Sequence, residues 1–143
     1  MRYFILVIIF CFSTVIILAQ SNLTIKKLDS SNNKLIYLIQ NEKRLYLLTL
    51  FEASSQLIVR LNNKKGGKLI FQQKVNSGVS LGINTYTKGK DPILYIEVGS
   101  NVLYAHEIVF GKTIKFKKGL PMKGTILNEY YNKFLEKNDR ISW

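Results

Sequence analysis

The sequence predicts an all-β protein, an antiparallel immunoglobulin-like β-sandwich of about seven or eight strands followed by a short amphipathic helix near the C-terminus. Short runs of Leu, Ile, Val, Tyr and Phe are separated about every 8–12 residues by Gly, Asn, Lys or Pro, which is the all-β pattern. Several runs alternate apolar and polar residues, as expected where one face of a sheet is buried and the other is solvated. No helical pattern lies between the strands, so a parallel α/β fold is excluded.

Eight strands are expected, and residues 23–28 are a candidate edge strand. The eight strands span residues 35–40, 45–51, 56–61, 69–75, 81–86, 93–98, 102–110 and 113–117. The connections carry turn chemistry, because Asn and Gly tolerate the positive φ angles that hairpins require. The clearest hairpin joins 93–98 to 102–110 through Gly99, Ser100 and Asn101.

One strand illustrates the expected faces. In residues 56–61, Leu57 and Val59 should point towards the core, while Ile58 and Arg60 should point towards solvent. After Pro121 the pattern changes to a helical period, and a helix over residues 126–137 is expected to pack on the sandwich. Its apolar stripe is formed by Ile126, Leu127, Tyr130 and Phe134. The sandwich domain is therefore assigned to residues 20–120, and the helix and tail to 121–143.

Residues 1–19 are typical of a secretory signal peptide. Arg2 is followed by seventeen residues without a charge, and the predicted cleavage point lies between Ala19 and Gln20. The alternative is an uncleaved membrane anchor formed by residues 3–19. Both interpretations place the rest of the chain outside the cytoplasm, in the periplasm, on the cell surface or in the extracellular space. The single cysteine, Cys11, lies in this segment, which excludes a disulfide-stapled or thiol-dependent mature protein.

Candidate catalytic residues are few, and the chain is not expected to be an enzyme. His106 is the only histidine and lies within a predicted strand, without recognisable partners for nucleophilic catalysis. Glu97 and Glu107 lie on adjacent predicted strands and could approach each other, as glycoside hydrolysis requires of two carboxylates. Lysines near both residues favour ion pairing instead. No metal-ligand spacing and no cofactor motif is found, so neither a metal nor a cofactor is expected.

The basic residues carry the information about partners. The chain has 21 Lys and Arg against 9 Asp and Glu, a net charge of +12. Two groups of lysines could bind a polyanion such as lipopolysaccharide, an acidic glycan or an anionic lipid surface: Lys64, Lys65 and Lys68, and Lys112, Lys115, Lys117 and Lys118. The alternative is that these lysines protect sheet edges and keep the protein soluble. Nucleic acid is not an expected partner because the chain is exported.

Three stretches carry a family resemblance: LIVRLNNKKGGKLIFQQKV from Leu57, SLGINTY from Ser80 and DPILYIEVGSNVLYAHEIV from Asp91. Their rhythm of strands and Gly-containing turns resembles the small secreted immunoglobulin-like modules of Bacteroidetes, including the sorting domains of the type IX secretion system. The leader end at Ala19-Gln20 is similar to that of exported proteins of the same group. The resemblance implies a sandwich fold and a location in the bacterial envelope.

Together these features predict a non-catalytic exported module of the cell envelope with a binding or structural role. Its partner would be another envelope protein or an anionic glycan or lipid surface. Two alternatives remain open at this point: a module for secretion sorting or surface anchoring, and a basic polyanion binder.

Overall fold

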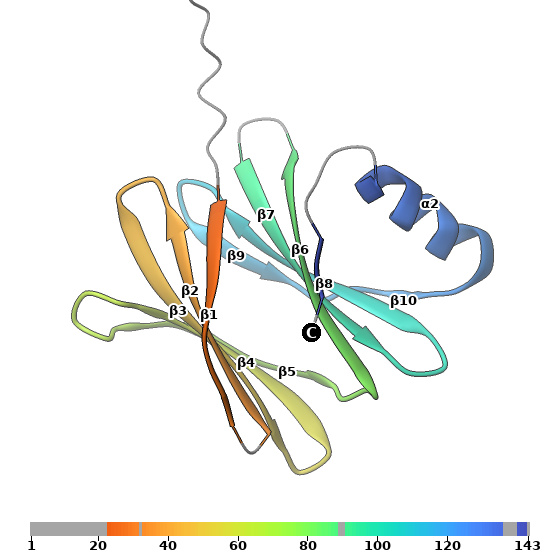
Figure 1. Cartoon of the computed structure of the whole chain (residues 1–143), viewed down its shortest axis with the longest axis horizontal. Helices are drawn as coiled ribbons and strands as arrows, with labels where there is room; N and C mark the ends of the chain where they lie inside the picture. Colours follow the sequence, from red (N-terminus) through yellow and green to blue (C-terminus); the bar gives the residue numbers. More distant parts are fainter. Residues whose placement is uncertain (1–22, 32, 89–90, 136–139, 143) are drawn as a thin grey trace, which may run out of the picture.

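Two antiparallel sheets face each other, and one helix covers the outer side of the second sheet (Figure 1). The computed structural model describes residues 23–31, 33–88, 91–135 and 140–142. The predicted signal peptide, residues 1–19, and its alternative as an anchor over residues 3–19 lie outside the described residues. The predicted all-β sandwich is confirmed.

The first sheet contains five strands in sequence order: β1 (Leu23–Ser31), β2 (Lys34–Asn41), β3 (Arg44–Ala53), β4 (Gln56–Asn63) and β5 (Leu69–Asn76). All five were expected, including the candidate edge strand at residues 23–28. Short turns join them, and residues with positive φ such as Asn33 (61°) and Glu42 (55°) close the first two hairpins. Neighbours in sequence are therefore neighbours in the sheet.

The second sheet is built around β7 (Asp91–Gly99). Its strand order is β10-β8-β7-β6-β11, and β9 also pairs with β8. The remaining strands are β6 (Ser80–Lys88), β8 (Leu103–Phe110), β9 (Ile114–Lys117), β10 (Pro121–Met122) and β11 (Arg140–Ser142). The strands β10 and β11 were not predicted, because two or three residues are too short to show an alternating pattern.

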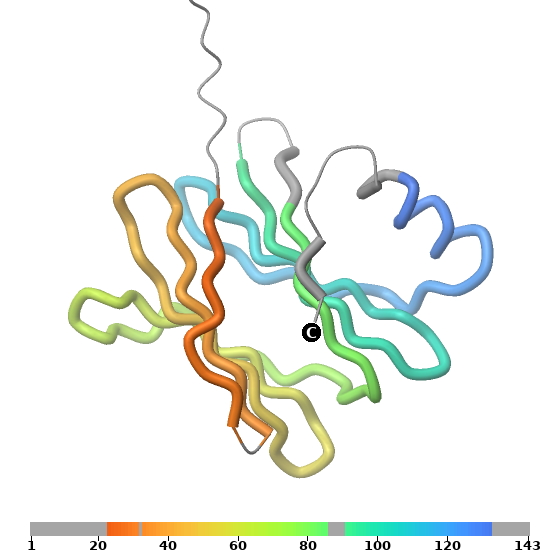
Figure 2. The backbone as a smooth tube through the Cα atoms, viewed as in Figure 1, coloured from red at the N-terminus to blue at the C-terminus, as the bar shows by residue number. Residues whose placement is uncertain are grey.

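The connectivity differs from the immunoglobulin-like arrangement that was predicted. In that fold several of the connections between consecutive strands cross from one sheet to the other. Here the chain completes the first sheet before it enters the second through residues 77–79, as the tube in Figure 2 shows. Strand patterns encode which face is buried but not which sheet a strand joins, so the sequence predicted the sandwich and not its strand order.

The main core lies between the two sheets. Its fully buried side chains include Ile39, Leu48, Leu61, Leu94, Ile96 and Ile108. The expected orientation of β4 is correct for Leu57 and Val59, but Ile58 is only 4 % exposed. Ile58 is paired with Phe51 and Lys74 on the outer face, where Arg60 lies 5.2 Å from the centre of the Phe51 ring. Long neighbouring side chains therefore cover this face.

The helix α2 (Gly124–Leu135) gives β7 a second buried face. The residues Leu94, Ile96 and Val98 of β7 point into the main core, while Ile93 and Tyr95 form a smaller cluster on the opposite face. The ring of Tyr130 in α2 packs edge-on against Tyr95 at 5.8 Å. The helix packs on the sandwich as predicted, through Tyr130, but the prediction was wrong for Ile126, which is 61 % exposed. The helix also begins two residues earlier than expected, and residues 136–137 lie outside the described residues.

Candidate functional site

Four basic residues at two neighbouring turns line one hollow at an end of the first sheet. The two turns are adjacent because β3 pairs with β4, and the Lys64 N–H donates to the Leu45 carbonyl at 3.0 Å. The hollow has a volume of about 460 Å³ and is lined by Lys43, Arg44, Leu45, Asn63, Lys64 and Lys65. We call Lys43, Arg44, Lys64 and Lys65 the basic turn cluster. The sequence indicated Lys64 and Lys65, but the register of β3 and β4 adds Lys43 and Arg44.

Hydrogen bonds hold the β4–β5 turn in place. The Asn63 N–H donates to the Lys68 carbonyl at 2.8 Å, and the Lys65 N–H donates to Asn63 Oδ1 at 3.1 Å. Gly66 and Gly67, which lie between Lys65 and Lys68, have φ angles of 82° and 64°, which glycine adopts without strain. The predicted lysine Lys68 thus lies at the base of the turn, and the backbone that carries Lys64 and Lys65 is fixed by local contacts.

The predicted residue Lys112 lies at the same end of the molecule, on the second sheet. The rings of Tyr46 and Phe110 are 5.5 Å apart, so the start of β3 faces the end of β8. Figure 1 shows the β2–β3 and β8–β9 turns on the same side. Glu42 in the first of these turns is an acidic neighbour of the basic turn cluster. Lys112 therefore lies at the same end of the sandwich as the β2–β3 turn but does not line the hollow.

The other predicted lysines are separate from this cluster. Lys115 and Lys117 pair with Val109 and Glu107 along β8–β9, on the outer face of the second sheet. The Nζ atom of Lys117 lies 4.0 Å from Oε2 of Glu107. Lys118 follows at the end of β9. The structure thus divides the lysines at positions 112–118 between the end of the sandwich and its edge.

His106 is a buried core residue, only 1 % exposed. Its ring is stacked against Tyr104 and Phe116, and its Nδ1 accepts a hydrogen bond from the Gly119 N–H at 2.9 Å. Nε2 has no hydrogen-bond partner among the described residues. Burial, with a smaller effect of Lys118, lowers the pKa of His106 to about 4. The imidazole is therefore neutral at pH 7 and is enclosed by aromatic rings.

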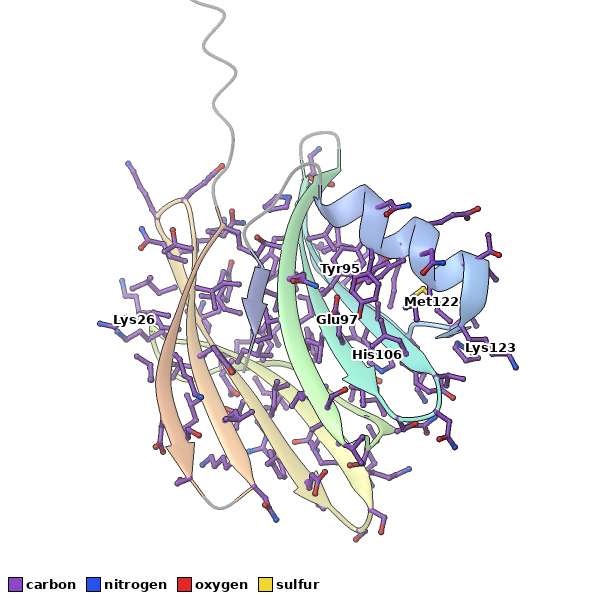
Figure 3. The ribbon with its side chains drawn as sticks, turned by 45° about the vertical axis from the view of Figure 1, so that its right-hand side comes forward. Lys26, Tyr95, Glu97, His106, Met122 and Lys123 are labelled. Carbon is purple, nitrogen blue, oxygen red and sulfur yellow. The ribbon has the colours of Figure 1, made fainter. Side chains whose placement is uncertain are left out.

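A buried polar cluster joins α2 to the second sheet. Oε1 of Glu97 accepts hydrogen bonds from Asn84 Nδ2 and, at 2.9 Å, from the Tyr130 hydroxyl. Figure 3 shows Glu97 and Tyr95 beneath the helix. Glu97 is 3 % exposed. Burial raises the pKa of the Tyr130 phenol, and the adjacent Glu97 carboxylate raises it further.

The two carboxylates considered for catalysis have different surroundings. Glu97 is opposite Ala105 and Glu107 is opposite Tyr95, so the two share a face and are offset along it. Glu97 accepts hydrogen bonds from Asn84 and Tyr130, whereas Glu107 faces Lys117. These contacts give Glu97 a role in fixing the helix.

Replacing Tyr130 with phenylalanine should lower the free energy of unfolding by about 1.5–3 kcal/mol, because it removes a donor to a buried carboxylate. Hydrogen exchange should also become faster in α2. Tyr104→Phe in the same sheet serves as the control, since its hydroxyl is not part of the Glu97 cluster. Equal urea midpoints for the two variants would show that the bond to Glu97 contributes no specific stability.

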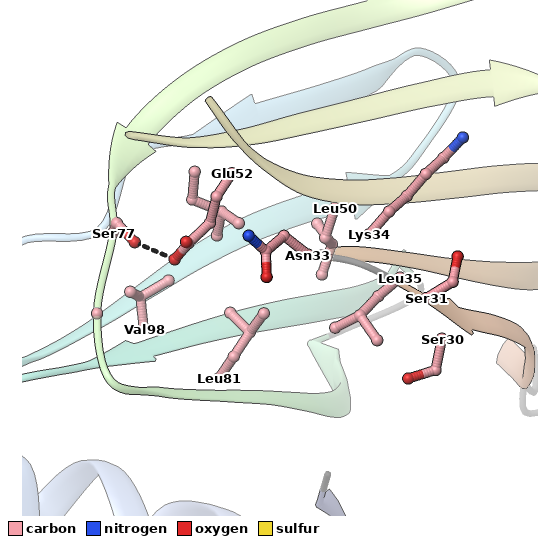
Figure 4. A pocket seen from close by; sticks show the side chains of 12 residues that line it. Ser30, Ser31, Asn33, Lys34, Leu35, Leu50, Glu52, Ser77, Leu81 and Val98 are labelled. Atoms are coloured by element: carbon pink, nitrogen blue, oxygen red, sulfur yellow. Dashed lines mark hydrogen bonds between the residues drawn. The ribbon is translucent and has the colours of Figure 1, made fainter. Parts of the chain in front are cut away.

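Other hollows among the described residues lie away from the basic turn cluster. One, of about 320 Å³, opens between the sheets and is lined by Leu50, Leu81 and Val98 with Ser77, whose hydroxyl donates to Glu52 (Figure 4). Another, of about 710 Å³, reaches from Leu35 and Leu81 to Glu97 and Tyr131. Neither is lined by the lysines that the sequence indicated.

The described residues contain no group of three or more His, Cys, Asp or Glu side chains that could hold a metal ion. Among the same residues no helix is both long and apolar enough to cross a membrane.

Comparison of the chain with family models, curated proteins and solved structures gives no match. The positions of its own side chains therefore carry the functional inference.

Proposed function

We propose that the chain is an exported, non-catalytic binding module of the cell envelope, and that the basic turn cluster binds acidic glycans, including the phosphorylated saccharides of lipopolysaccharide. Export is supported by the apolar segment that precedes Ala19 and by the sequence resemblance described above. The observation that carries the choice of ligand is that four basic residues line one hollow, which two neighbouring turns form.

The chemistry of the cluster suits a repeating anion. The guanidinium of Arg44 can donate two parallel hydrogen bonds to one carboxylate, sulfate or phosphate group. Lys43, Lys64 and Lys65 add point charges on flexible stems, which adapt to different spacings between anionic groups. The net charge of +12 attracts such a ligand from a distance and raises its association rate.

Reversing two charges in the cluster tests this proposal. The double variant Lys64→Glu/Lys65→Glu should bind heparin, used as a model acidic polysaccharide, roughly tenfold or more weakly at low salt. The matched control is Lys26→Glu/Lys74→Glu, which changes the net charge equally at exposed positions outside the cluster; Figure 3 shows Lys26 on the first sheet. Calorimetric titration gives both affinities. Equal losses in the two variants would contradict a defined site and indicate binding through net charge alone.

Two further measurements test the remaining parts of the proposal. The mass of the protein recovered outside the cytoplasm should correspond to a chain that begins at Gln20. The non-catalytic assignment fails if the purified protein hydrolyses glycan, ester or peptide substrates and loses this activity in His106→Ala or Glu97→Gln.

A further inference from the structure

The edge of the second sheet carries two large aliphatic side chains that point into solvent. Leu120 is 80 % exposed and Ile126, in the first turn of α2, is 61 % exposed. They lie in one short segment that contains β10 and the start of the helix. Met122 between them is instead partly buried against the cluster of Ile93, Tyr95 and Ala105. The segment is thus anchored on the sheet by Met122 and exposes aliphatic side chains before and after it.

The backbone at this edge is fixed by contacts with β8. β9 ends at Lys117 and β10 begins at Pro121, so both pair with β8 and leave a break between them. Gly119 fills the break: its N–H donates to His106, and a Cβ atom there would lie 2.2 Å from the Ala105 carbonyl oxygen. Leu120 is therefore presented by a backbone held from both sides.

Lysines flank these aliphatic side chains along the chain. Residues 111–126 contain five lysines and no acidic residue. Within the part of the chain that the structure describes, Lys117 forms an ion pair with Glu107, while Lys115, Lys118 and Lys123 are exposed. Figure 3 shows Lys123 projecting outwards next to Met122, below the first turn of α2.

We propose that this edge, formed by Lys115, Lys118, Leu120, Lys123 and Ile126, docks on the surface of an anionic lipid bilayer. We call it the lipid-docking edge. Aliphatic side chains next to lysines are the combination that binds a membrane interface, because the former enter the acyl boundary while the latter contact lipid phosphates. A second copy of the chain is the less suitable occupant, because it also carries a net charge of +12. Its own edge, or another of its surfaces, would place positive charge against positive charge.

The lipid-docking edge is distinct from the basic turn cluster. The cluster belongs to the β2–β3 and β4–β5 turns of the first sheet, while the edge belongs to β9, β10 and α2. The two proposals can therefore fail separately. Variants of the edge should keep their affinity for heparin, and Lys64→Glu/Lys65→Glu should keep most of its lipid binding.

Co-sedimentation with lipid vesicles tests the inference. The protein as exported is mixed with vesicles of phosphatidylcholine alone or with phosphatidylglycerol added, and the difference between the two lipid mixtures is the readout. An apolar segment at residues 3–19 would bind both mixtures, so its contribution cancels. The protein should bind the anionic vesicles preferentially. Replacing both Lys115 and Lys123 with Gln should weaken this binding about fivefold for each lysine removed.

Removal of the aliphatic side chains separates docking from charge attraction. Leu120→Ser/Ile126→Ser should weaken binding to anionic vesicles about tenfold or more, because two side chains no longer enter the bilayer. Val79→Ser is the matched control, since Val79 is 94 % exposed and lies outside the edge. An equal loss in the control, or no preference for anionic vesicles, would overturn the proposal. Self-association of the protein that disappears in Leu120→Ser would assign the edge to a second copy instead.

Discussion

Replacing Gly119 with alanine is expected to lower the free energy of unfolding by about 3 kcal/mol or more. The added Cβ atom would lie 2.2 Å from the carbonyl oxygen and 2.9 Å from the nitrogen of Ala105. These are backbone atoms of β8, which pairs on its other side with the central strand β7. Relief would require β9 and β10 to move away from β8 and would stretch the hydrogen bond from Gly119 to His106.

Gly111→Ala is the control for this prediction. A Cβ atom at Gly111 would meet the Asp91 side chain at 3.2 Å, and a carboxylate can rotate away. Urea denaturation should therefore give a much smaller change for Gly111→Ala, below about 1 kcal/mol. Equal stability of the two alanine variants would show that the backbone at Gly119 does not lie as close to β8 as the structure places it.

Acidification is expected to destabilise the protein through His106. The pKa of His106 is lowered from 6.5 to about 4 by burial, with a smaller effect from Lys118. Between these two pH values the unfolded chain binds a proton at His106 that the folded chain does not bind. The free energy of unfolding therefore has its full value above about pH 6.5 and decreases as the pH falls from 6.5 towards 4. Below pH 4 this group causes no further change. The total loss is about 3 kcal/mol.

The His106→Asn variant isolates this effect. Asn can present an oxygen near the position of Nδ1 and accept the Gly119 N–H, but it does not titrate. The free energy of unfolding, measured between pH 8 and pH 4, should fall less in the variant than in the wild type. An unchanged pH dependence would mean that His106 is protonated in the folded state as readily as in the unfolded one.

Much of the fold could be predicted from the sequence because the strands are long and alternate. The turn at residues 62–67 and the hairpin through Gly99 carry residues that favour tight turns, and both are present. The burial of both faces of β7 was not predicted, since alternation indicates burial on one face only. That second face is buried because Tyr130 and Met122 pack on it, a contact between segments remote in sequence.

The candidate site was predicted in part. Lys64 and Lys65 are neighbours in the chain, and a turn exposes them together. Lys43 and Arg44 join them only through the register between β3 and β4, which no local pattern specifies. Similarly, the lysines at positions 112–118 form one group in the sequence, but the direction of β9 separates Lys112 at the turn from Lys117 beside Glu107.

The salt dependence of glycan binding tests the central claim most directly. Titration of the exported protein with heparin at several salt concentrations should show that the affinity falls steadily as salt rises. Each basic side chain that contacts heparin displaces counterions from the polysaccharide, and added salt both opposes this release and screens the charges. The slope should become shallower in Lys64→Glu/Lys65→Glu and change less in Lys26→Glu/Lys74→Glu. Affinity that does not depend on salt, or no binding at low salt, would contradict a polyanion site formed by these two turns.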